Sequence, residues 1–113
     1  MSVVNNYAVI PPFEITYDSE VAKQLATIER LHYSLIRRTI EEQLRFEPEV
    51  ETRNRKPLLR PSTLGTAWEL RFGPRNRFRV YYRADTAAQV VPVLAIGYKV
   101  GNRLFIGGKE FDL

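Results

Sequence analysis

Cysteine is absent from this 113-residue sequence, and histidine occurs once, at position 32. The absence of cysteine excludes disulfide bridges, thiolate metal sites and a cysteine nucleophile, and it suits a reducing compartment. Long apolar runs are missing as well: stretches such as Val90–Ile96 fall far short of the ~20 residues that span a bilayer. No lysine or arginine precedes Lys23, so the basic start of a secretory signal is lacking. We therefore expect a cytoplasmic protein without a membrane segment.

Patterns that depend on a metal or a cofactor are also missing. No group of histidine, aspartate and glutamate has the spacing of metal ligands, no glycine-rich phosphate loop occurs, and no serine has a base beside it. His32 falls between two predicted helices and away from the arginine-rich strands, where a helix-end or surface role is favoured over catalysis. We therefore expect no metal and no cofactor.

Charge is distributed unevenly along the chain. Residues 1–52 hold five basic and nine acidic side chains, whereas residues 53–109 hold twelve basic side chains and only two acidic ones, Glu69 and Asp85. A basic half of this kind is typical of proteins with phosphate-rich partners, although a solvated surface or a patch for an acidic protein would give the same count. Nucleic acid is one partner that the charge indicates.

Hydrophobic spacing predicts a strand and two helices in the first half of the chain. Phe13–Tyr17 alternates between apolar and polar residues like a half-buried strand, and Asp18 or Ser19 can cap the helix that follows. Apolar residues recur every three or four positions over residues 21–31 and again over 35–44, which predicts two helices. Two consecutive helices with a short joint should form an antiparallel hairpin.

The second half of the chain predicts a long loop and then strands. Residues 47–66 contain three prolines and no hydrophobic period, which predicts a long basic loop. Strand-like runs follow at residues 67–72, 77–83, 89–96 and 103–106. Pro92 predicts a bulge or an unpaired edge in the run that contains it. The order β-α-α-β-β-β predicts an α+β domain in which an antiparallel meander carries the helical hairpin on one face.

Alternation along the meander assigns its two faces. The side chains predicted to lie against the helices are Trp68, Leu70, Phe72, Phe78, Val80 and Tyr82. Those predicted on the opposite, open face are Glu69, Arg71, Arg77, Arg79, Tyr81 and Arg83. An exposed sheet face is polar in any case, but this one is nearly free of acids, which favours a functional basic face.

Such a face can act on phosphodiesters without a metal or a histidine. Arginine and lysine orient a scissile phosphate and stabilise the charge that develops in its transition state. RNA supplies its own nucleophile, the 2′-hydroxyl, whereas DNA has none. The face therefore favours RNA as substrate, and the basic loop Arg53–Lys56 is either a phosphate contact or a solvated loop.

Three motifs in order also resemble those of a known family. They are Trp68–Phe72 (WELRF), Arg77–Tyr82 (RFRVYY) and Val93–Lys99 (VLAIGYK), and residues 13–31 resemble the start of the same family. Over about residues 13–106 the chain resembles the RelE/ParE superfamily of toxins from bacterial type II toxin–antitoxin systems. The resemblance implies one RelE-like domain over residues 1–113.

For ribosome-dependent members, the resemblance implies cleavage of mRNA in the ribosomal A site by basic residues. Carried over by position, Arg79 is the candidate stabiliser of the transition state, and Arg71 and Lys99 are the other catalytic candidates. The candidates for RNA binding are Arg53, Arg55, Lys56, Arg60, Arg77, Tyr81, Arg83, Arg103 and Phe105. Glu69 stands where the best-known nuclease of the family has a lysine, and Phe105 where that nuclease has a tyrosine.

Phenylalanine can stack on a base but cannot transfer a proton, so Tyr81 and Tyr98 are the possible substitutes for that tyrosine. The leading hypothesis is a toxin that cleaves mRNA on the ribosome as a metal-independent endoribonuclease. The alternatives are a ParE-like inhibitor of DNA gyrase without hydrolytic activity and a non-toxic binding module. In each version the resemblance implies a cognate antitoxin as partner, and we expect it to dock on the outer faces of the helices and at Leu104–Ile106.

Overall fold

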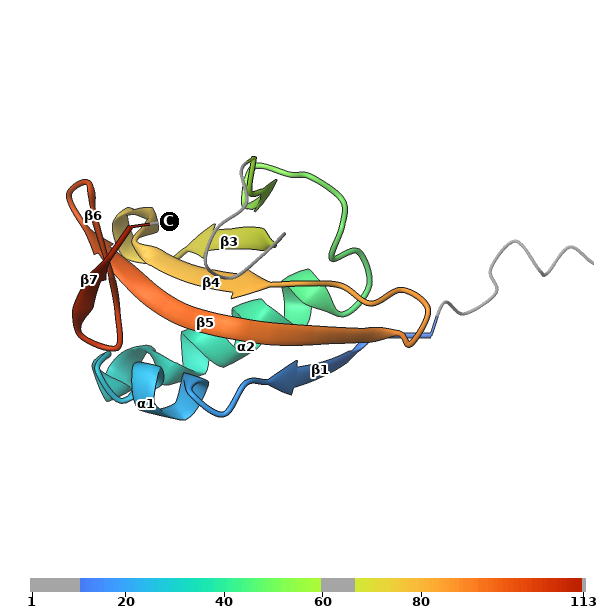
Figure 1. The fold of residues 1–113 in the computed structure, drawn as a ribbon, viewed down its shortest axis with the longest axis horizontal. Helices are drawn as coiled ribbons and strands as arrows, with labels where there is room; N and C mark the ends of the chain where they lie inside the picture. The colour runs from blue at the N-terminus through green and yellow to red at the C-terminus, as the bar shows by residue number, and fades with distance from the viewer. Residues whose placement is uncertain (1–10, 60–66, 113) are drawn as a thin grey trace, which may run out of the picture.

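The computed structural model describes residues 11–59 and 67–112 of the chain. Figure 1 shows a curved sheet with helices beside it. The elements in chain order are β1 (Glu14–Tyr17), α1 (Val21–Leu25), the 3-10 turn η2 (Arg30–His32), α2 (Tyr33–Leu44), β2 (Arg55–Pro57), β3 (Trp68–Phe72), the 3-10 turn η3 (Pro74–Asn76), β4 (Phe78–Tyr82), β5 (Val90–Val100), β6 (Arg103–Ile106) and β7 (Lys109–Phe111). The predicted α+β class with an antiparallel meander, β3-β4-β5, is confirmed.

Strand β5 is the centre of the sheet. It pairs antiparallel with β4 along one edge, and along the other edge it pairs parallel with β1 and antiparallel with β6. Between the segments of β5 that pair with β1 and with β6, a backbone amide bonds to a side chain. The amide of Ile96 donates a hydrogen bond of 2.9 Å to Oε1 of Gln24 in α1. This bond satisfies a backbone donor and fixes α1 to the sheet.

The first helix is shorter than predicted. Residues 21–31 have helical spacing, but α1 ends at Leu25 and Leu31 is 74% exposed. Glu29 takes an extended conformation (φ −61°, ψ 136°), which breaks the helical path before η2. The hydroxyl of Tyr33 donates a hydrogen bond of 3.0 Å to the carbonyl of Leu25, so a side chain satisfies this carbonyl at the helix end. The second predicted helix is present as α2.

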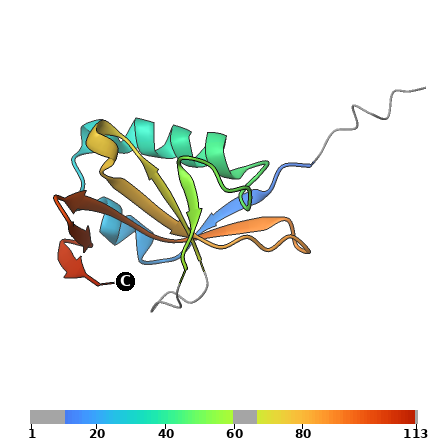
Figure 2. The same ribbon diagram turned by 90° about the horizontal axis from the view of Figure 1, so that it is seen from above.

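The main core lies between the helices and one face of the sheet, as Figure 2 shows from above. Helix α2 contributes Ile36, Ile40 and Leu44, which recur every four residues and so form one buried stripe. The sheet contributes Leu70, Phe72, Phe78, Val80, Tyr82, Val91, Val93 and Ile96, with Trp68 partly buried against them. The predicted apolar face of the meander is therefore confirmed.

The opposite face of the sheet is not open, which corrects the prediction. Tyr81 is 1% exposed and Arg79 only 9%, although both were assigned to solvent. The β6–β7 hairpin packs Leu104 and Ile106 against Tyr81 and Ala95, with Leu58 and Phe111 at the margin. Gly97 permits this approach, because a Cβ there would overlap the carbonyl oxygen of Phe105. Leu104 and Ile106 are therefore buried and do not offer the docking surface that the sequence predicted.

The segment predicted as a long loop contains a strand. β2 pairs antiparallel with β3, so that Arg55 lies opposite Leu70 and Lys56 opposite Glu69. The bulge predicted near Pro92 is present in β5, where the pairing with β4 shifts between Tyr81 and Tyr82. Strand β5 itself extends four residues beyond its predicted end, to Val100, and this extension carries the hairpin over the second face.

Candidate functional site: a charged cleft over β3 and β4

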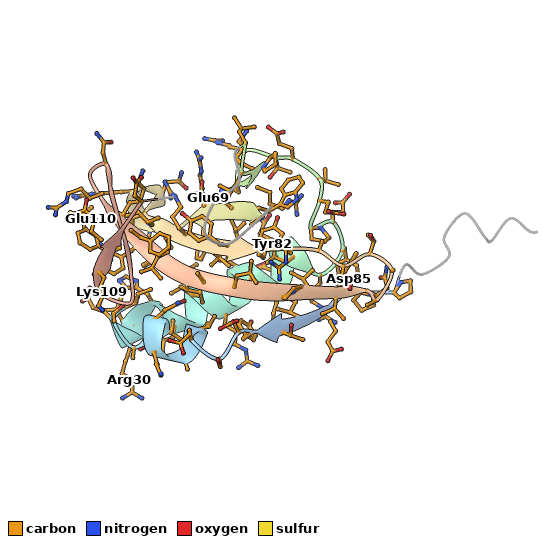
Figure 3. The ribbon with its side chains drawn as sticks, viewed as in Figure 1. Arg30, Glu69, Tyr82, Asp85, Lys109 and Glu110 are labelled. Atoms are coloured by element: carbon orange, nitrogen blue, oxygen red, sulfur yellow. The ribbon has the colours of Figure 1, made fainter. Side chains whose placement is uncertain are left out.

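Glu69 is the centre of a cluster of charged and polar side chains on the second face of the sheet. Its Oε1 accepts a hydrogen bond of 2.5 Å from Nε of Arg71, and its Oε2 accepts one of 2.7 Å from the hydroxyl of Tyr81. Nε of Arg79 lies 3.8 Å from the same Oε2. The strand register explains the grouping, since Glu69 lies opposite Tyr81 and Arg71 lies opposite Arg79. Figure 3 labels Glu69 at this position of the sheet.

Burial shifts the pKa values of two members of this cluster, Arg79 and Tyr81. It lowers the pKa of the Arg79 guanidinium below its ordinary value, while the nearby charge of Glu69 acts in the opposite direction. Burial also raises the pKa of the Tyr81 phenol, and the Glu69 carboxylate raises it further. Tyr81 therefore stays protonated and donates to Glu69. The raised pKa disfavours Tyr81 as a base, and its role as the proton-transferring substitute suggested by the sequence stays a prediction.

A cleft of about 660 Å³ lies beside the cluster. Its lining consists of Leu58, Glu69, Arg71, Tyr81, Lys99, Asn102, Arg103, Leu104, Glu110, Phe111 and Asp112. Two of the three catalytic candidates, Arg71 and Lys99, therefore face one cavity. Arg79 does not line it, because its side chain is 10% exposed and donates to the backbone carbonyls of Asn76 and Phe78.

The cleft is less basic than the sequence predicted. Strand β7 brings Glu110 into the lining, Asp112 follows at its end, and Glu69 adds a third carboxylate. Arg103 donates a hydrogen bond of 2.8 Å to Glu110, which raises the pKa of Arg103 and lowers the pKa of Glu110. The two side chains are 64% and 53% exposed, so water weakens the pair. Figure 3 labels Glu110 and Lys109 on this strand.

The candidates from the predicted basic loop take different positions. Arg55 is 7% exposed, and its guanidinium donates to the carbonyls of Gln43 and Val50, so it joins β2 to the helix side and cannot bind RNA in this position. Lys56 lies on the second face and forms an ion pair of 3.4 Å with Glu51. Arg53 is exposed. Arg60 lies outside the described residues.

Arg77 reaches toward the helices, which corrects the prediction that His32 lies away from the arginine-rich strands. Nη2 of Arg77 lies 3.0 Å from Nε2 of His32 and 4.0 Å from Glu29. The imidazole packs edge-on against Phe78, with ring centroids 5.0 Å apart. His32 is the residue before α2, so its predicted helix-end position is confirmed.

The remaining candidates lie at the two ends of the sheet. Arg83 is exposed just after β4. Phe105 stacks on Tyr98 with ring centroids 5.6 Å apart, and the guanidinium of Arg103 lies 5.4 Å from the Phe105 centroid. Phe105 lies opposite Glu110 of β7, so the stack and Glu110 are on the same side of β6. Neither ring lines the cleft.

A second cavity, of about 650 Å³, lies on the helix side between β1, α1 and α2. Its lining is largely apolar and consists of Phe13, Glu14, Ile15, Tyr17, Val21, Ala22, Leu25, Tyr33, Ile36, Arg37, Ile40, Glu41, Arg45 and Ile96. We call it the helix-side groove. Tyr17 is 48% exposed there, so the groove presents apolar surface to solvent.

Two kinds of feature are absent from residues 11–59 and 67–112. No three histidine, aspartate or glutamate side chains are grouped closely enough to hold a metal ion. No helix in these ranges is long and apolar enough to cross a membrane.

Comparison with known proteins identifies the fold. No family model and no curated protein matches the chain. Among solved structures, it is similar to a chain in the crystal structure of the toxin–antitoxin complex RelBE2 from Mycobacterium tuberculosis, with a TM-score of 0.64 and 18% sequence identity. The alignment covers 80% of this chain and 95% of that one. The chain has the RelE-like fold.

On this RelE-like fold, residues 102–112, which include the β6–β7 hairpin, contribute cleft-lining side chains that sequence reasoning missed. Glu110, Asp112 and Asn102 line the cleft, yet none was singled out. The signal for the hairpin was present, because Gly107-Gly108 is a sequence typical of a tight turn between paired strands. The pairing of Glu69 with both arginines had no such signal.

Proposed function

We propose that this chain is the toxin of a bacterial type II toxin–antitoxin pair and that it cleaves mRNA on the ribosome. The observation that supports this most is the meeting of Arg71 and Lys99 in one cleft, with Arg79 one strand away from Arg71, on a RelE-like fold. Arg71 is the most accessible arginine of the Glu69 cluster, with a side chain 40% exposed.

The proposed reaction uses the RNA as its own nucleophile. The 2′-oxygen attacks the adjacent phosphorus, the bond from phosphorus to the 5′-oxygen breaks, and the products carry a 2′,3′-cyclic phosphate and a 5′-hydroxyl. The 2′-hydroxyl loses a proton and the leaving 5′-oxygen gains one, through solvent. Arg71 and Lys99 orient the phosphate and stabilise the negative charge that grows on its oxygens.

The partner in this proposal is an antitoxin that docks in the helix-side groove. The groove exposes apolar surface, which a partner segment with apolar side chains would remove from water. It lies on the opposite side of the sheet from the charged cleft. An antitoxin docked there would leave the cleft uncovered, so inhibition would need a second contact or exclusion from the ribosome.

One observation favours the alternative, a DNA gyrase inhibitor without hydrolytic activity. Glu69 holds both arginines of the cluster, and the pKa of Tyr81 is raised, so this phenol is not a base near neutral pH. A surface of paired charges suits binding as well as catalysis.

The test is mapping of 5′ ends in cellular mRNA after brief induction without an antitoxin. New ends should carry a 5′-hydroxyl and should be detected only after enzymatic phosphorylation. Arg71→Ala should lower their yield by roughly 100-fold or more. Arg38→Ala is the matched control, because Arg38 is an exposed arginine on α2 that pairs with Glu42.

Three outcomes would contradict the nuclease proposal. The first is growth arrest with intact mRNA, which would favour gyrase and should then be accompanied by gyrase-dependent DNA breaks. The second is equal cleavage by the Arg71→Ala and Arg38→Ala variants, which would remove Arg71 from the site. The third is growth without any arrest, which would favour the non-toxic binding module.

A further inference from the structure

The Glu69 carboxylate occupies the place that an anionic ligand would take among the arginines. It receives Nε of Arg71 at 2.5 Å and the hydroxyl of Tyr81 at 2.7 Å, and it lies 3.8 Å from Nε of Arg79. These are donors from three side chains on two adjacent strands, directed at one carboxylate whose side chain is 10% exposed. Planar guanidinium groups bind phosphate oxygens with the same geometry as carboxylate oxygens.

We propose that Glu69 is an internal competitor for phosphate: it pairs with Arg71, which lines the cleft, and with the buried Arg79, and an RNA phosphate must displace it to reach Arg71. The proposal rests on RNA as the ligand of the proposed function. It adds a role for Glu69 that the resemblance does not supply, since Glu69 departs from the family's best-known nuclease at this position.

The arrangement has a physical reason. Arg79 is largely buried, and a buried guanidinium without a counter-charge is strongly unfavourable. Glu69 supplies this counter-charge and keeps both guanidinium groups in place. A free phosphate ion has to replace these bonds with its own. An RNA strand makes further contacts, for example with Lys99 in the same cleft, and can therefore still bind.

Glu110 provides a matched comparison within the same cleft. It also carries one negative charge and pairs with one arginine, Arg103, at 2.8 Å. Its side chain is 53% exposed, so water already competes for the pair. Replacing either glutamate with glutamine changes the net charge of the cleft equally. Only Glu69→Gln removes a carboxylate from Arg71, which is 40% exposed and lines the cleft, and from the buried Arg79.

The experiment measures binding of inorganic phosphate, and of a hexanucleotide RNA with 2′-O-methyl groups that block its cleavage, by NMR of the arginine Nε–H groups. Glu69→Gln should tighten phosphate binding roughly tenfold to a hundredfold, the range set by bonds to charged groups. Glu110→Gln should change it less than twofold. Equal effects of the two variants, or no phosphate binding by Glu69→Gln, would overturn the proposal.

A second measurement needs no variant. In the unaltered chain, the 13C signal of the Glu69 carboxyl should shift together with the Arg71 Nε signal as the 2′-O-methyl RNA is added. A shift of Arg71 alone, or no shift of either, would overturn the proposal. If the carboxylate is displaced but induced cells show no new mRNA ends, the cleavage proposal fails and the role of Glu69 stands. If new mRNA ends appear but the carboxylate is not displaced, the role of Glu69 fails and the cleavage proposal stands.

Discussion

Tyr81 and Glu69 are joined across β3 and β4 by a hydrogen bond of 2.7 Å from the phenol hydroxyl to Oε2. The acceptor is a carboxylate and the donor is buried, so the bond should be worth more than one between neutral groups. Tyr33 offers an internal comparison, since its hydroxyl donates to the neutral carbonyl of Leu25 at 3.0 Å in a partly buried position.

Replacing each tyrosine with phenylalanine separates the two cases. Tyr81→Phe should lower the free energy of unfolding by about 2 kcal/mol, because it removes a bond to a charged group, and Tyr33→Phe by about 1 kcal/mol. Urea unfolding followed by Trp68 fluorescence measures both. Equal losses, or a larger loss for Tyr33→Phe, would contradict a charge-assisted bond at Glu69.

Alkaline pH should destabilise the folded chain through its buried phenols. Burial raises the pKa of both Tyr81 and Tyr82 above their ordinary value. In the unfolded chain these phenols ionise near pH ~10, whereas the folded chain keeps their protons. Stability is therefore complete below that pH, and above it falls by up to about 1.4 kcal/mol per pH unit for each phenol.

The measurement is the free energy of urea unfolding between neutral pH and pH ~11.5, with phenolate absorbance recorded in the folded chain. Tyr81→Phe should remove about half of the decline. If the free energy of unfolding of Tyr81→Phe falls with pH as steeply as that of the unaltered chain, other groups cause the decline. If every tyrosine ionises before the chain unfolds, the burial argument is contradicted.

The main core was predictable because alternation decides which side of a strand meets the helices. Leu70, Val80 and Tyr82 follow that rule directly, and all three are almost fully buried. The end of α1 was not predictable in the same way. Val21 and Leu25 continue in spacing to Ile28, but the extended conformation of Glu29 depends on how the chain must turn to begin α2.

The candidate site was harder to predict. The alternation of apolar and polar residues along a strand predicts the face on which a side chain lies, but it does not predict which other segment covers that face. Arg71 was assigned to that face and lines the cleft, whereas Arg79 was assigned to solvent and is buried. Two features explain why Arg79 is buried. The β6–β7 hairpin covers this face, and Glu69, two residues before Arg71 in β3, accepts a hydrogen bond from Arg71 and pairs with Arg79. Contacts between residues on different strands depend on how the hairpin folds over the sheet. A hydrophobic pattern within one segment of the sequence does not predict that folding.

The contact between Arg77 and His32 predicts the tautomer of the imidazole. A guanidinium has donors only, so Nε2 of His32 must accept the bond of 3.0 Å and the ring proton must reside on Nδ1. Two-bond 15N–1H correlation spectra of the neutral ring should therefore show the Nδ1–H form. In Arg77→Ala the commoner Nε2–H form should gain population, while Arg75→Ala, a neighbouring exposed arginine, should leave the tautomer unchanged. An Nε2–H ring in the unaltered chain would contradict the contact.

The helix-side groove predicts where a single charge should disrupt partner binding. Tyr17 lies in the groove with 48% of its surface exposed, so Tyr17→Glu should be tolerated by the fold. The new carboxylate would be buried against the apolar segment of an antitoxin, and it would stand close to Glu41 and Arg37, whose opposite charges both act on Tyr17. We expect affinity for the antitoxin of the proposed function to fall by roughly 100-fold.

Leu31→Glu is the matched control for this charge. Leu31 is 74% exposed and does not line the groove, so an antitoxin docked in the groove should bind that variant as it binds the unaltered chain. Titration calorimetry with the purified antitoxin measures both affinities, and thermal unfolding of the free variants checks that each is folded. Loss of binding in Leu31→Glu alone would move the docking surface to the turn between α1 and α2. Unchanged binding in Tyr17→Glu would exclude the groove as the principal contact, because burying a carboxylate against apolar groups lowers affinity.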